Sequence, residues 1–495
     1  MASIQSTKEL LRARFVGKSL HQVPTPAVVL DLAKVENNCD IMLRAAERQQ
    51  LNWRAHIKTH KTVELTRLQV GDDASTPVNI VTSTLAEAES VVPLLRDYQS
   101  KGRQVNVLYS FPLYVSSIDR LANISAQLGP GGLTVMVDHP EQLNLLTLLA
   151  SKSGNKPLVF LKINVGSNRA GVVPDSPVCA TMVRELLLSE TNGSSVFLGL
   201  YSHAGHSYKS RKDWEAMGIL GVEFATLYEV ARAVQSERPG KQLVLSVGAT
   251  PTVKSLQHPG FGHESGGAST GGDGRSDSGT AGKEQALLIA ASNGGAAATT
   301  EQLGDLMARM RDDHLTLEVH AGVYPTLDIQ QIAAHSCDAA HLSASDIAIT
   351  VLAEIASVYP GRGQAGTTEA LINAGILALG RDPCEDMGEV KGQHYGAWGI
   401  VMPWAGVENV VPGPAFPAVH GGWQVTRLAQ EHGVLAWKGG VREAETPLAV
   451  GQRVRVWPNH SCITGAGHAW YLVVDSRNAG REDEVVDVWP RFNGW

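Results

Sequence analysis

Lys58 stands where a short buried strand is predicted to end, and this position suits covalent chemistry. Residues 54–57 (Arg-Ala-His-Ile) read as the buried strand, and a helical pattern begins near Val63. A lysine held among polar groups at a strand end can form a Schiff base, because burial lowers its pKa and exposes a nucleophilic amine. The alternative is that Lys58 and Lys61 are solvated lysines of an ordinary strand-to-helix loop.

A second segment has the composition of a phosphate-binding turn. Gly248, Ala249 and Thr250 follow an apolar strand, so backbone N–H groups and a hydroxyl would be available to an anion. Gly322 and Tyr324 follow the next predicted strand and would complete the same cradle. The alternative is that the Gly-x-Thr-Pro-Thr sequence simply makes a turn and a helix N-cap.

Two loops in the middle of the chain add polar and aromatic side chains. Arg169 follows one predicted strand in a glycine-flanked loop. Tyr201 ends the next strand, and His203, His206 and Tyr208 follow it. The alternative is that Arg169 pairs with a neighbouring carboxylate and that the histidines satisfy loop backbone groups.

His460 and Cys462 form a candidate metal pair near the carboxyl end. The two are separated by one residue, so in extended backbone their side chains point the same way. Imidazole and thiolate together are zinc ligands. Two protein ligands are fewer than the usual three of a catalytic zinc, which would leave positions open to substrate and water. A lone His-x-Cys pair also occurs without metal.

The elements that must hold most of these residues alternate between strands and helices over residues 25–342. Seven or eight such units favour a (β/α)8 TIM-type barrel over an open doubly wound sheet. Residues 32–48 have the apolar spacing of an amphipathic helix. The predicted strands are residues 25–31, 79–82, 105–109, 133–138, 158–164, 196–201, 243–247 and 315–319.

The remainder of the chain differs in character. Residues 343–495, with part of 1–24, show short alternating runs and turns that predict an antiparallel β domain carrying the metal pair. Within the barrel, residues 260–283 are rich in Gly and Ser and predict a surface insertion. The Ala- and Gly-rich residues 290–300 are predicted to belong to the same elaboration.

The composition argues against nucleic-acid-binding, membrane-spanning and disulfide-rich classes of protein. The 495 residues carry a net charge of −7, which gives no electrostatic case for nucleic acid binding. No apolar run is long enough to predict a membrane span. Five scattered cysteines do not form a disulfide framework, so we expect a reducing, cytoplasmic location. The mildly basic amino terminus leaves an organellar presequence conceivable.

Taken together, these segments resemble the fold-type III pyridoxal-phosphate enzymes, in the group of eukaryotic D-serine dehydratase and D-threonine aldolase. The resemblance implies that Lys58, not Lys61, carries the cofactor, and that the protein is a homodimer in which one subunit's β domain helps to close its partner's site. Ala249 departs from the Ser that this group commonly has in the phosphate turn. The motifs that carry the resemblance are residues 56–61, 168–171, 201–205, 248–252, 322–324, 431–433 and 459–462.

The expected activity is a pyridoxal 5'-phosphate- and zinc-dependent D-serine ammonia-lyase, with Lys58 as the base and zinc assisting departure of the β-hydroxyl. Arg169 facing the pyridine nitrogen would keep that nitrogen unprotonated, because a guanidinium does not give up its proton. The alternatives are retro-aldol cleavage of β-hydroxy D-amino acids, as in D-threonine aldolase, and a non-catalytic cofactor carrier. A racemase would need a second base, which the sequence does not identify.

Overall fold

The computed structural model describes residues 4–262, 280–337, 341–384, 397–404, 422–438 and 442–495. The chain divides into two compact units. We call the unit made of Met42–Lys58, Val70–Gly322 and Gly494–Trp495 the barrel unit. The unit made of Met1–Ile41, Thr59–Gln69 and Val323–Asn493 is the sheet unit.

Eight parallel strands close into a barrel in the barrel unit, in the order in which they follow one another along the chain. Closure comes from the last strand pairing with the first. Most residues of these strands are buried, and β5 and β6 are buried almost throughout, as expected for parallel strands covered on both faces. The predicted (β/α)8 barrel is confirmed. Its strands are β2 (Asn52–His56), β3 (Val78–Thr82), β4 (Val105–Pro112), β5 (Leu133–Val137), β6 (Leu158–Lys162), β7 (Val196–Tyr201), β8 (Val244–Val247) and β9 (Thr316–Ala321).

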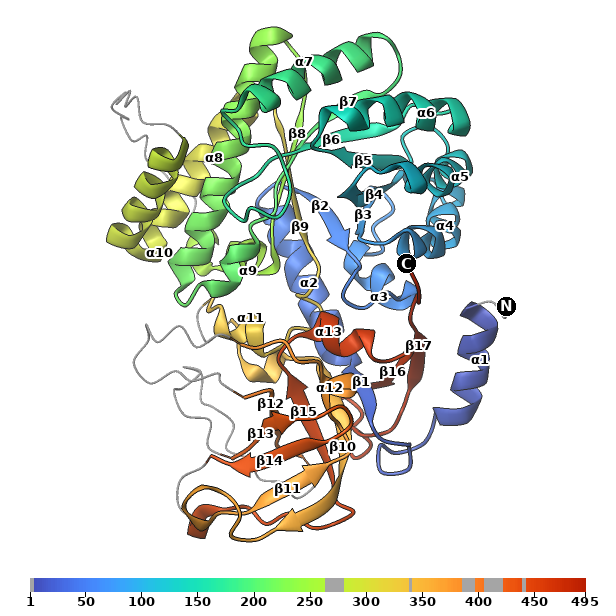
Figure 1. Cartoon of the computed structure of the whole chain (residues 1–495), viewed down its shortest axis with the longest axis vertical. Helices are drawn as coiled ribbons and strands as arrows, with labels where there is room; N and C mark the ends of the chain where they lie inside the picture. Colours follow the sequence, from blue (N-terminus) through green and yellow to red (C-terminus); the bar gives the residue numbers. More distant parts are fainter. Residues whose placement is uncertain (1–3, 263–279, 338–340, 385–396, 405–421, 439–441) are drawn as a thin grey trace. The chain divides into compact units, whose positions relative to one another are not determined.

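Helices connect these strands and lie around their outside (Figure 1). Two more helices, α2 (Leu32–Arg48) and α3 (Val63–Val70), contribute residues to both units and have the helical form that the sequence predicts. The connecting helices of the barrel unit are α4 (Leu85–Ser100), α5 (Ile118–Leu128), α6 (Leu143–Ser153), α7 (Pro177–Thr191), α8 (Asp213–Glu237), α9 (Thr250–Lys254) and α10 (Thr280–Asp312).

A buried ion pair lies inside the barrel. Arg54 Nε of β2 donates to Glu318 Oε1 of β9 at 2.7 Å, and both side chains are at most 3% exposed. Arg54 Nη1 also donates to Asn106 Oδ1 at 2.7 Å, and the Thr134 hydroxyl donates to the same oxygen at 2.9 Å. The guanidinium therefore meets hydrogen-bond partners from strands on both sides of β2, which offsets the cost of burying its charge.

The sheet unit is built on a nine-stranded, largely antiparallel sheet in the described residues, with the order β11-β14-β13-β12-β15-β10-β1-β16-β17. This confirms the predicted β domain. The strands are β1 (Ala27–Asp31), β10 (Ile349–Tyr359), β11 (Glu369–Ile372), β12 (Gly399–Met402), β13 (Trp423–Leu428), β14 (Gly433–Trp437), β15 (Arg453–Pro458), β16 (Trp470–Val474) and β17 (Asp487–Pro490).

The position of β1 corrects the sequence analysis, which took residues 25–31 as the first barrel strand. β1 pairs antiparallel with β10 and parallel with β16, in the interior of the nine-stranded sheet. An apolar strand buried on both faces gives the same pattern in either setting, so the pattern alone does not choose the sheet. Residues 25–41 and 323–342 accordingly group with the sheet unit.

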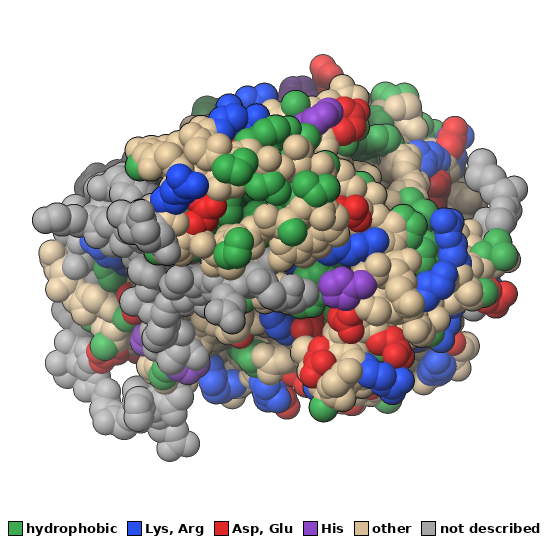
Figure 2. Space-filling view, turned by 90° about the horizontal axis from the view of Figure 1, so that it is seen from below, with side chains coloured by type: hydrophobic (Ala, Val, Ile, Leu, Met, Phe, Trp, Pro, Cys, Tyr) green, Lys and Arg blue, Asp and Glu red, His purple; other side chains and the backbone are tan. Residues whose placement is uncertain are grey.

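Short helices flank the sheet. The amino-terminal helix α1 (Ile4–Phe15) lies beside β17, and Leu11 and Phe15 join the core that Val29 and Leu472 form (Figure 1). On the face drawn in Figure 2, basic and acidic side chains of the described residues are interspersed. The other helices of this unit are α11 (Ile329–Ala333), α12 (Ile376–Leu379) and α13 (Ser461–Ala466).

The predicted insertion at 260–283 falls partly outside the described residues, which resume at Thr280 with α10. Residues 290–300, which were expected to belong to the same elaboration, lie within α10, so their composition is not that of a linker here. Alanine is the strongest helix former, and the single non-helical residue there is Gly295, with φ of 66°.

We expect Glu318→Gln to destabilise the barrel by about 3–5 kcal/mol, because it leaves Arg54 buried without a counter-charge. Urea unfolding followed by circular dichroism measures this loss. Asp97→Asn, which breaks the exposed pair with Lys101, is the matched control and should cost less than about 1 kcal/mol. Equal losses in the two variants would contradict a role for the buried pair.

Candidate active site

Lys58 lies in a turn two residues beyond the end of β2, where the sequence places it. Before the turn, the N–H of Ile57 donates to the carbonyl of Val81, and His56 Nε2 lies 2.9 Å from the Ser83 hydroxyl. The backbone is therefore held in place up to the residue that precedes Lys58. The side chain of Lys58 is half-buried and faces a cavity.

This cavity has a volume of about 490 Å³ and opens at the carboxyl ends of the barrel strands. That volume is in the range of small-molecule and cofactor sites. The carboxyl end of a parallel barrel is also where catalytic residues gather in this fold. The lining residues are His56, Lys58, Ser83, Ser110, Phe111, Pro112, Met136, Asp138, Lys162, Arg169, Ala170, Tyr201 and His203.

Arg169 reaches the cavity from a loop that Asp138 holds. Asp138 Oδ2 accepts from the N–H of Gly171 at 2.9 Å, and Gly171 has a φ of 109°. A Cβ at Gly171 would come within 2.7 Å of the backbone nitrogen of Asn164, so the loop needs a glycine there. Within the described residues Arg169 has no ion-pair partner, which disfavours its pairing with a neighbouring carboxylate.

Three histidines near the cavity are held neutral. His203 Nδ1 lies 2.7 Å from the carbonyl of Gly248, so this nitrogen carries the proton and donates it. His320 Nδ1 lies 3.1 Å from the Ser246 hydroxyl. Burial, reinforced by the nearby lysines, lowers the pKa of His203, His320 and His56 well below the ordinary value. The histidines therefore add polarity to the site without adding positive charge.

Of the two tyrosines predicted in the middle of the chain, Tyr201 lines the cavity and Tyr208 is not among its described lining residues. Tyr201 stacks on His320, with 4.2 Å between ring centroids and 10° between ring planes. Burial raises the pKa of Tyr201, so its hydroxyl stays protonated. Tyr208 is half-buried in the following 3-10 turn, while His206 there is exposed.

The predicted phosphate turn lies at the start of α9. Gly248 has a φ of 143°, and a Cβ there would come within 2.4 Å of the His320 carbonyl oxygen. The N–H of Ala249 donates to Thr252 Oγ1 at 2.9 Å, so this donor already has an internal partner. Thr250 is buried at the first helical position. Glu223 takes a backbone hydrogen bond from Gly248 as well. The phosphate role of Gly248, Ala249 and Thr250 therefore stays a prediction.

Gly322 and Tyr324 belong to different units of the structure. A Cβ at Gly322 would come within 2.9 Å of the His56 carbonyl oxygen, so close packing against β2 explains this glycine. Tyr324 belongs to the sheet unit, where it is 1% exposed and has Cys39 and Gln69 as polar neighbours. Their joint contribution to a phosphate cradle stays a prediction.

The candidate metal pair lies at the start of α13, in the sheet unit. His460 is the N-cap residue and Cys462 is in the first turn. His460 Nδ1 is hydrogen-bonded to Asp382, and the Thr59 hydroxyl lies 3.1 Å from Cys462 Sγ. Burial opposes the charge of His460, but hydrogen bonds with Asp382 and Cys462 raise its pKa to about 10. A carboxylate on the second ring nitrogen is the usual support of a metal-bound histidine.

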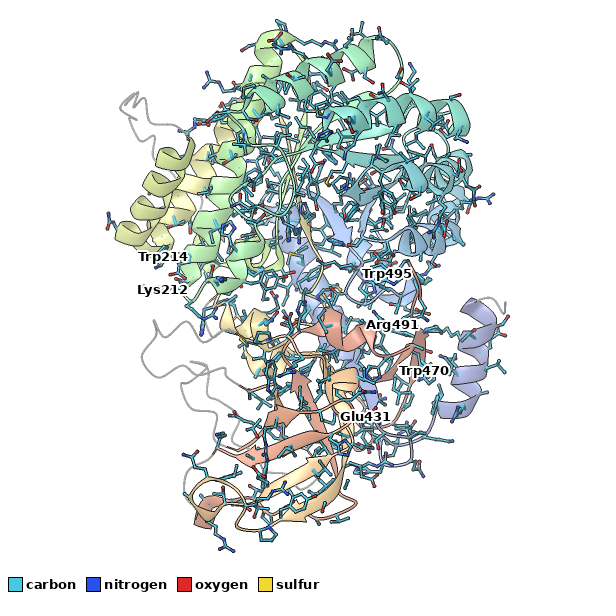
Figure 3. The ribbon with its side chains drawn as sticks, in the orientation of Figure 1. Lys212, Trp214, Glu431, Trp470, Arg491 and Trp495 are labelled. Atoms are coloured by element: carbon cyan, nitrogen blue, oxygen red, sulfur yellow. The ribbon has the colours of Figure 1, made fainter. Side chains whose placement is uncertain are left out.

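Two anchors fix α13 in place. Asp328 accepts from the N–H of Ser461 at 2.8 Å. Arg491, just beyond β17, donates to the carbonyl of Gly465 and, at 3.0 Å, to that of His468 (Figure 3). No group of three or more candidate metal donors occurs among the described residues. Any metal at His460 and Cys462 would therefore take its remaining ligands from outside the described side chains.

Four cavity residues were not predicted from the sequence: Ser83, Ser110, Asp138 and Lys162. Lys162 is the last residue of β6 and Asp138 directly follows β5. The available signal was a charged residue at the end of each buried strand. Its meaning depends on all eight strand ends meeting at one face of the barrel, which only the closed fold provides.

Two family models match different parts of the chain. A model of the alanine racemase N-terminal domain matches residues 30–263, and a model of a serine dehydratase domain matches residues 348–474. The D-serine dehydratase of Schizosaccharomyces pombe is 35% identical over 99% of this chain and 96% of its own length. The chain belongs to the D-serine dehydratase family.

The D-serine dehydratase of Saccharomyces cerevisiae is 31% identical over 98% of this chain and 99% of its own length. The solved structure of D-threo-3-hydroxyaspartate dehydratase from Delftia shares the fold, with a TM-score of 0.67, 24% identity, and coverage of 97% of this chain and all of that one. The named members of this family are dehydratases, which are lyases, so the chain is an enzyme and the alternative of a non-catalytic carrier is disfavoured.

None of the helices in the described residues is both long and apolar enough to cross a membrane.

We expect the stability of the protein to fall as the pH drops below about 6.5. The unfolded chain then binds protons at His56, His203 and His320 that the folded chain does not, which costs up to about 1.4 kcal/mol per pH unit for each histidine. Urea unfolding at pH 7.5, 6.5 and 5.5 measures the slope.

The variant His320→Asn should make this slope shallower, because one of the three neutral histidines is gone. His432→Gln, at an exposed position, is the matched control and should leave the slope unchanged. A wild-type stability that stays constant from pH 7.5 to 5.5 would contradict the neutral state of these histidines.

Proposed function

We propose that this protein is a D-serine ammonia-lyase that uses pyridoxal phosphate and zinc to convert D-serine into pyruvate and ammonia. The observation that carries the proposal is the convergence of Lys58, Arg169, Tyr201 and His203 on one cavity at the carboxyl end of the barrel. The names of the yeast relatives support the choice of D-serine.

The barrel unit fits pyridoxal phosphate. The cavity has room for a small ring compound and presents an amine at Lys58. The close approach of Gly248 to His320 leaves no space for a side chain at the turn proposed to face the phosphate. When bound, the cofactor supplies the electron sink that stabilises negative charge at the α-carbon of the amino acid.

In this proposal each cavity residue has a separate task. Lys58 Nζ removes the α-proton of the bound amino acid, since its side chain faces the cavity. Arg169 keeps the pyridine nitrogen free of a proton because guanidinium retains its own. Tyr201 acts as a protonated hydrogen-bond donor, and His203 stays neutral with its Nδ1 proton on the Gly248 carbonyl.

The His460–Cys462 pair fits zinc because it combines imidazole with thiol and has a carboxylate, Asp382, on the outer ring nitrogen. A zinc ion there would assist the departure of hydroxide, which is a poor leaving group. The Thr59 hydroxyl bonded to Cys462 belongs to the residue that follows Lys58 in the chain. A homodimer and a cytoplasmic location complete the proposal.

D-Threonine aldolase activity is the main alternative. The resemblance to D-threonine aldolase implies a His-x-Asp pair for that activity, whereas this chain has Cys462 in the place of the carboxylate. A carboxylate ligand favours a harder metal. Incubating the purified protein with D-serine, L-serine and D-threonine distinguishes the two. Pyruvate and ammonia from D-serine support the proposal, and glycine from D-threonine without pyruvate from D-serine would refute it.

Replacing Lys58 tests the cofactor attachment. Lys58→Ala should remove both the visible absorbance of the lysine-bound cofactor and the release of pyruvate, because no other amine is proposed to hold the cofactor. Lys61→Ala is the matched control three residues away and should keep the absorbance. Loss of the absorbance in Lys61→Ala, with its retention in Lys58→Ala, would reverse the assignment.

Removing the metal tests the role of the His460–Cys462 pair. Chelation, or Cys462→Ala, should abolish pyruvate formation from D-serine while leaving the visible absorbance of the cofactor intact. Chloride leaves without Lewis-acid help, so metal-free protein should still release chloride from β-chloro-D-alanine. If turnover of both substrates stops, the metal has a structural or substrate-positioning role instead.

The variant Cys462→Asp replaces the thiolate with a carboxylate, so the metal preference should shift from zinc towards manganese. Metal content and activity after reconstitution with each ion measure the shift.

A further inference from the structure

Lys162 is a second amine that faces the cavity and has no role in the proposed reaction. It ends β6 beside Tyr201 of β7 and is 5% exposed. Its Nζ lies 4.4 Å from the centroid of the Tyr201 ring. In the described part of the chain this nitrogen makes neither an ion pair nor a hydrogen bond. A buried amine with free donors is costly unless something else binds them.

The charges around the cavity point to the kind of ligand that Lys162 would bind. Lys58, Lys162 and Arg169 line the cavity, against a single lining carboxylate, Asp138. Asp138 already accepts from the N–H of Gly171 at 2.9 Å, and the two histidines that line the cavity, His56 and His203, are neutral. The described lining therefore carries excess positive charge and suits an anion.

Lys162 is also poised between its two protonation states. Burial and the charge of Arg169 lower its pKa to about 7, while Glu223 and Asp138 act in the opposite direction. Glu223 is itself fully buried and is hydrogen-bonded by the Ser202 hydroxyl at 2.9 Å. An anion placed against Nζ would favour the charged amine, so binding above neutral pH would draw a proton from solution.

We propose that Lys162 binds an anionic oxygen of the ligand in the barrel cavity and takes up a proton as it does so. The proposal rests on the proposed function for the identity of the ligands, which are the cofactor and an amino acid. Two oxygens have the required chemistry: the ring hydroxyl oxygen of pyridoxal phosphate and the carboxylate of the amino acid. Lys162 would contact either one directly, which makes it a binding residue of the active site.

The first test uses the wild-type holoenzyme and D-alanine, which has no β-leaving group. Calorimetric titration in buffers of different ionisation enthalpy counts the protons exchanged on binding. If the carboxylate is the partner, we expect proton uptake that is larger at pH 8 than at pH 6. If the ring oxygen is the partner, D-alanine binding shows no such difference, and the Lys162 proton is already bound in the holoenzyme.

The second test compares Lys162→Met, Lys162→Arg and Lys162→Gln. Loss of a charge-assisted hydrogen bond predicts a roughly 10- to 100-fold weaker ligand in Lys162→Met, with partial rescue in Lys162→Arg. Weaker cofactor retention on dialysis identifies the ring oxygen. Normal retention with weaker D-alanine binding and a higher KM for D-serine identifies the carboxylate. Lys152→Met, at an exposed position, is the control.

Two results together would overturn the proposal. The first is cofactor retention and D-alanine affinity within about twofold of wild type in Lys162→Met or Lys162→Gln. The second is the absence of pH-dependent proton uptake in the wild type. Should these variants fail to fold, two wild-type measurements decide the matter. They are proton uptake on D-alanine binding and the pH dependence of cofactor retention, and flat results in both would overturn it. Apart from the KM for D-serine, these measurements do not require turnover of D-serine, so a failure of the proposed substrate is seen separately, as absence of pyruvate.

Discussion

The hydrogen-bonded seam between β2 and β9 is the constraint on which the site depends. It joins the first barrel strand to the last, with Asn52 to Ala55 opposite Glu318 to Ala321. The Arg54–Glu318 ion pair crosses this seam inside the barrel, where water is excluded. Because the strands are parallel, closing the seam also brings every carboxyl end to one face. Lys162 and Tyr201 already lie opposite each other on β6 and β7, but Lys58 joins them at one cavity only through that closure.

The charge of the cavity depends on which of its basic and acidic side chains have hydrogen-bond partners. The three histidines are neutralised by burial and held by hydroxyl or carbonyl partners. The lysines and Arg169 have no such partners among the described acids, apart from the longer-range influence of Glu223 and Asp138 on Lys162. The carboxylate of the described lining, Asp138, holds the loop at Gly171 and does not pair with a lysine or arginine of the cavity. The positive charge of the lining is therefore available to a bound anion.

The barrel could be predicted because parallel strands need continuous apolar runs. Such runs can be recognised in the sequence without knowing which strands pair. The sequence also placed Lys58, Arg169 and Tyr201 on the right local elements, whereas it predicted extended backbone at the His460–Cys462 pair, where helix α13 begins. It failed for β1, whose apolar pattern is the same in a barrel and in the middle of a sheet. It overlooked Lys162, since a strand-end charge has meaning only beside other strand ends. It could not foresee that the N–H of Ala249 would be taken by Thr252.

The interior position of β1 has a consequence for how the chain is made. Its neighbours β10 and β16 lie more than 300 residues further along the chain. At a synthesis rate of about 5–20 residues per second, β1 leaves the ribosome roughly tens of seconds before β16 exists. During that interval both of its edges lack their partners, and unpaired strand edges invite aggregation. The barrel can fold as the chain emerges, whereas the sheet has to wait for the end of translation. Chaperone dependence during synthesis should therefore concentrate on the first thirty or so residues, not on the barrel.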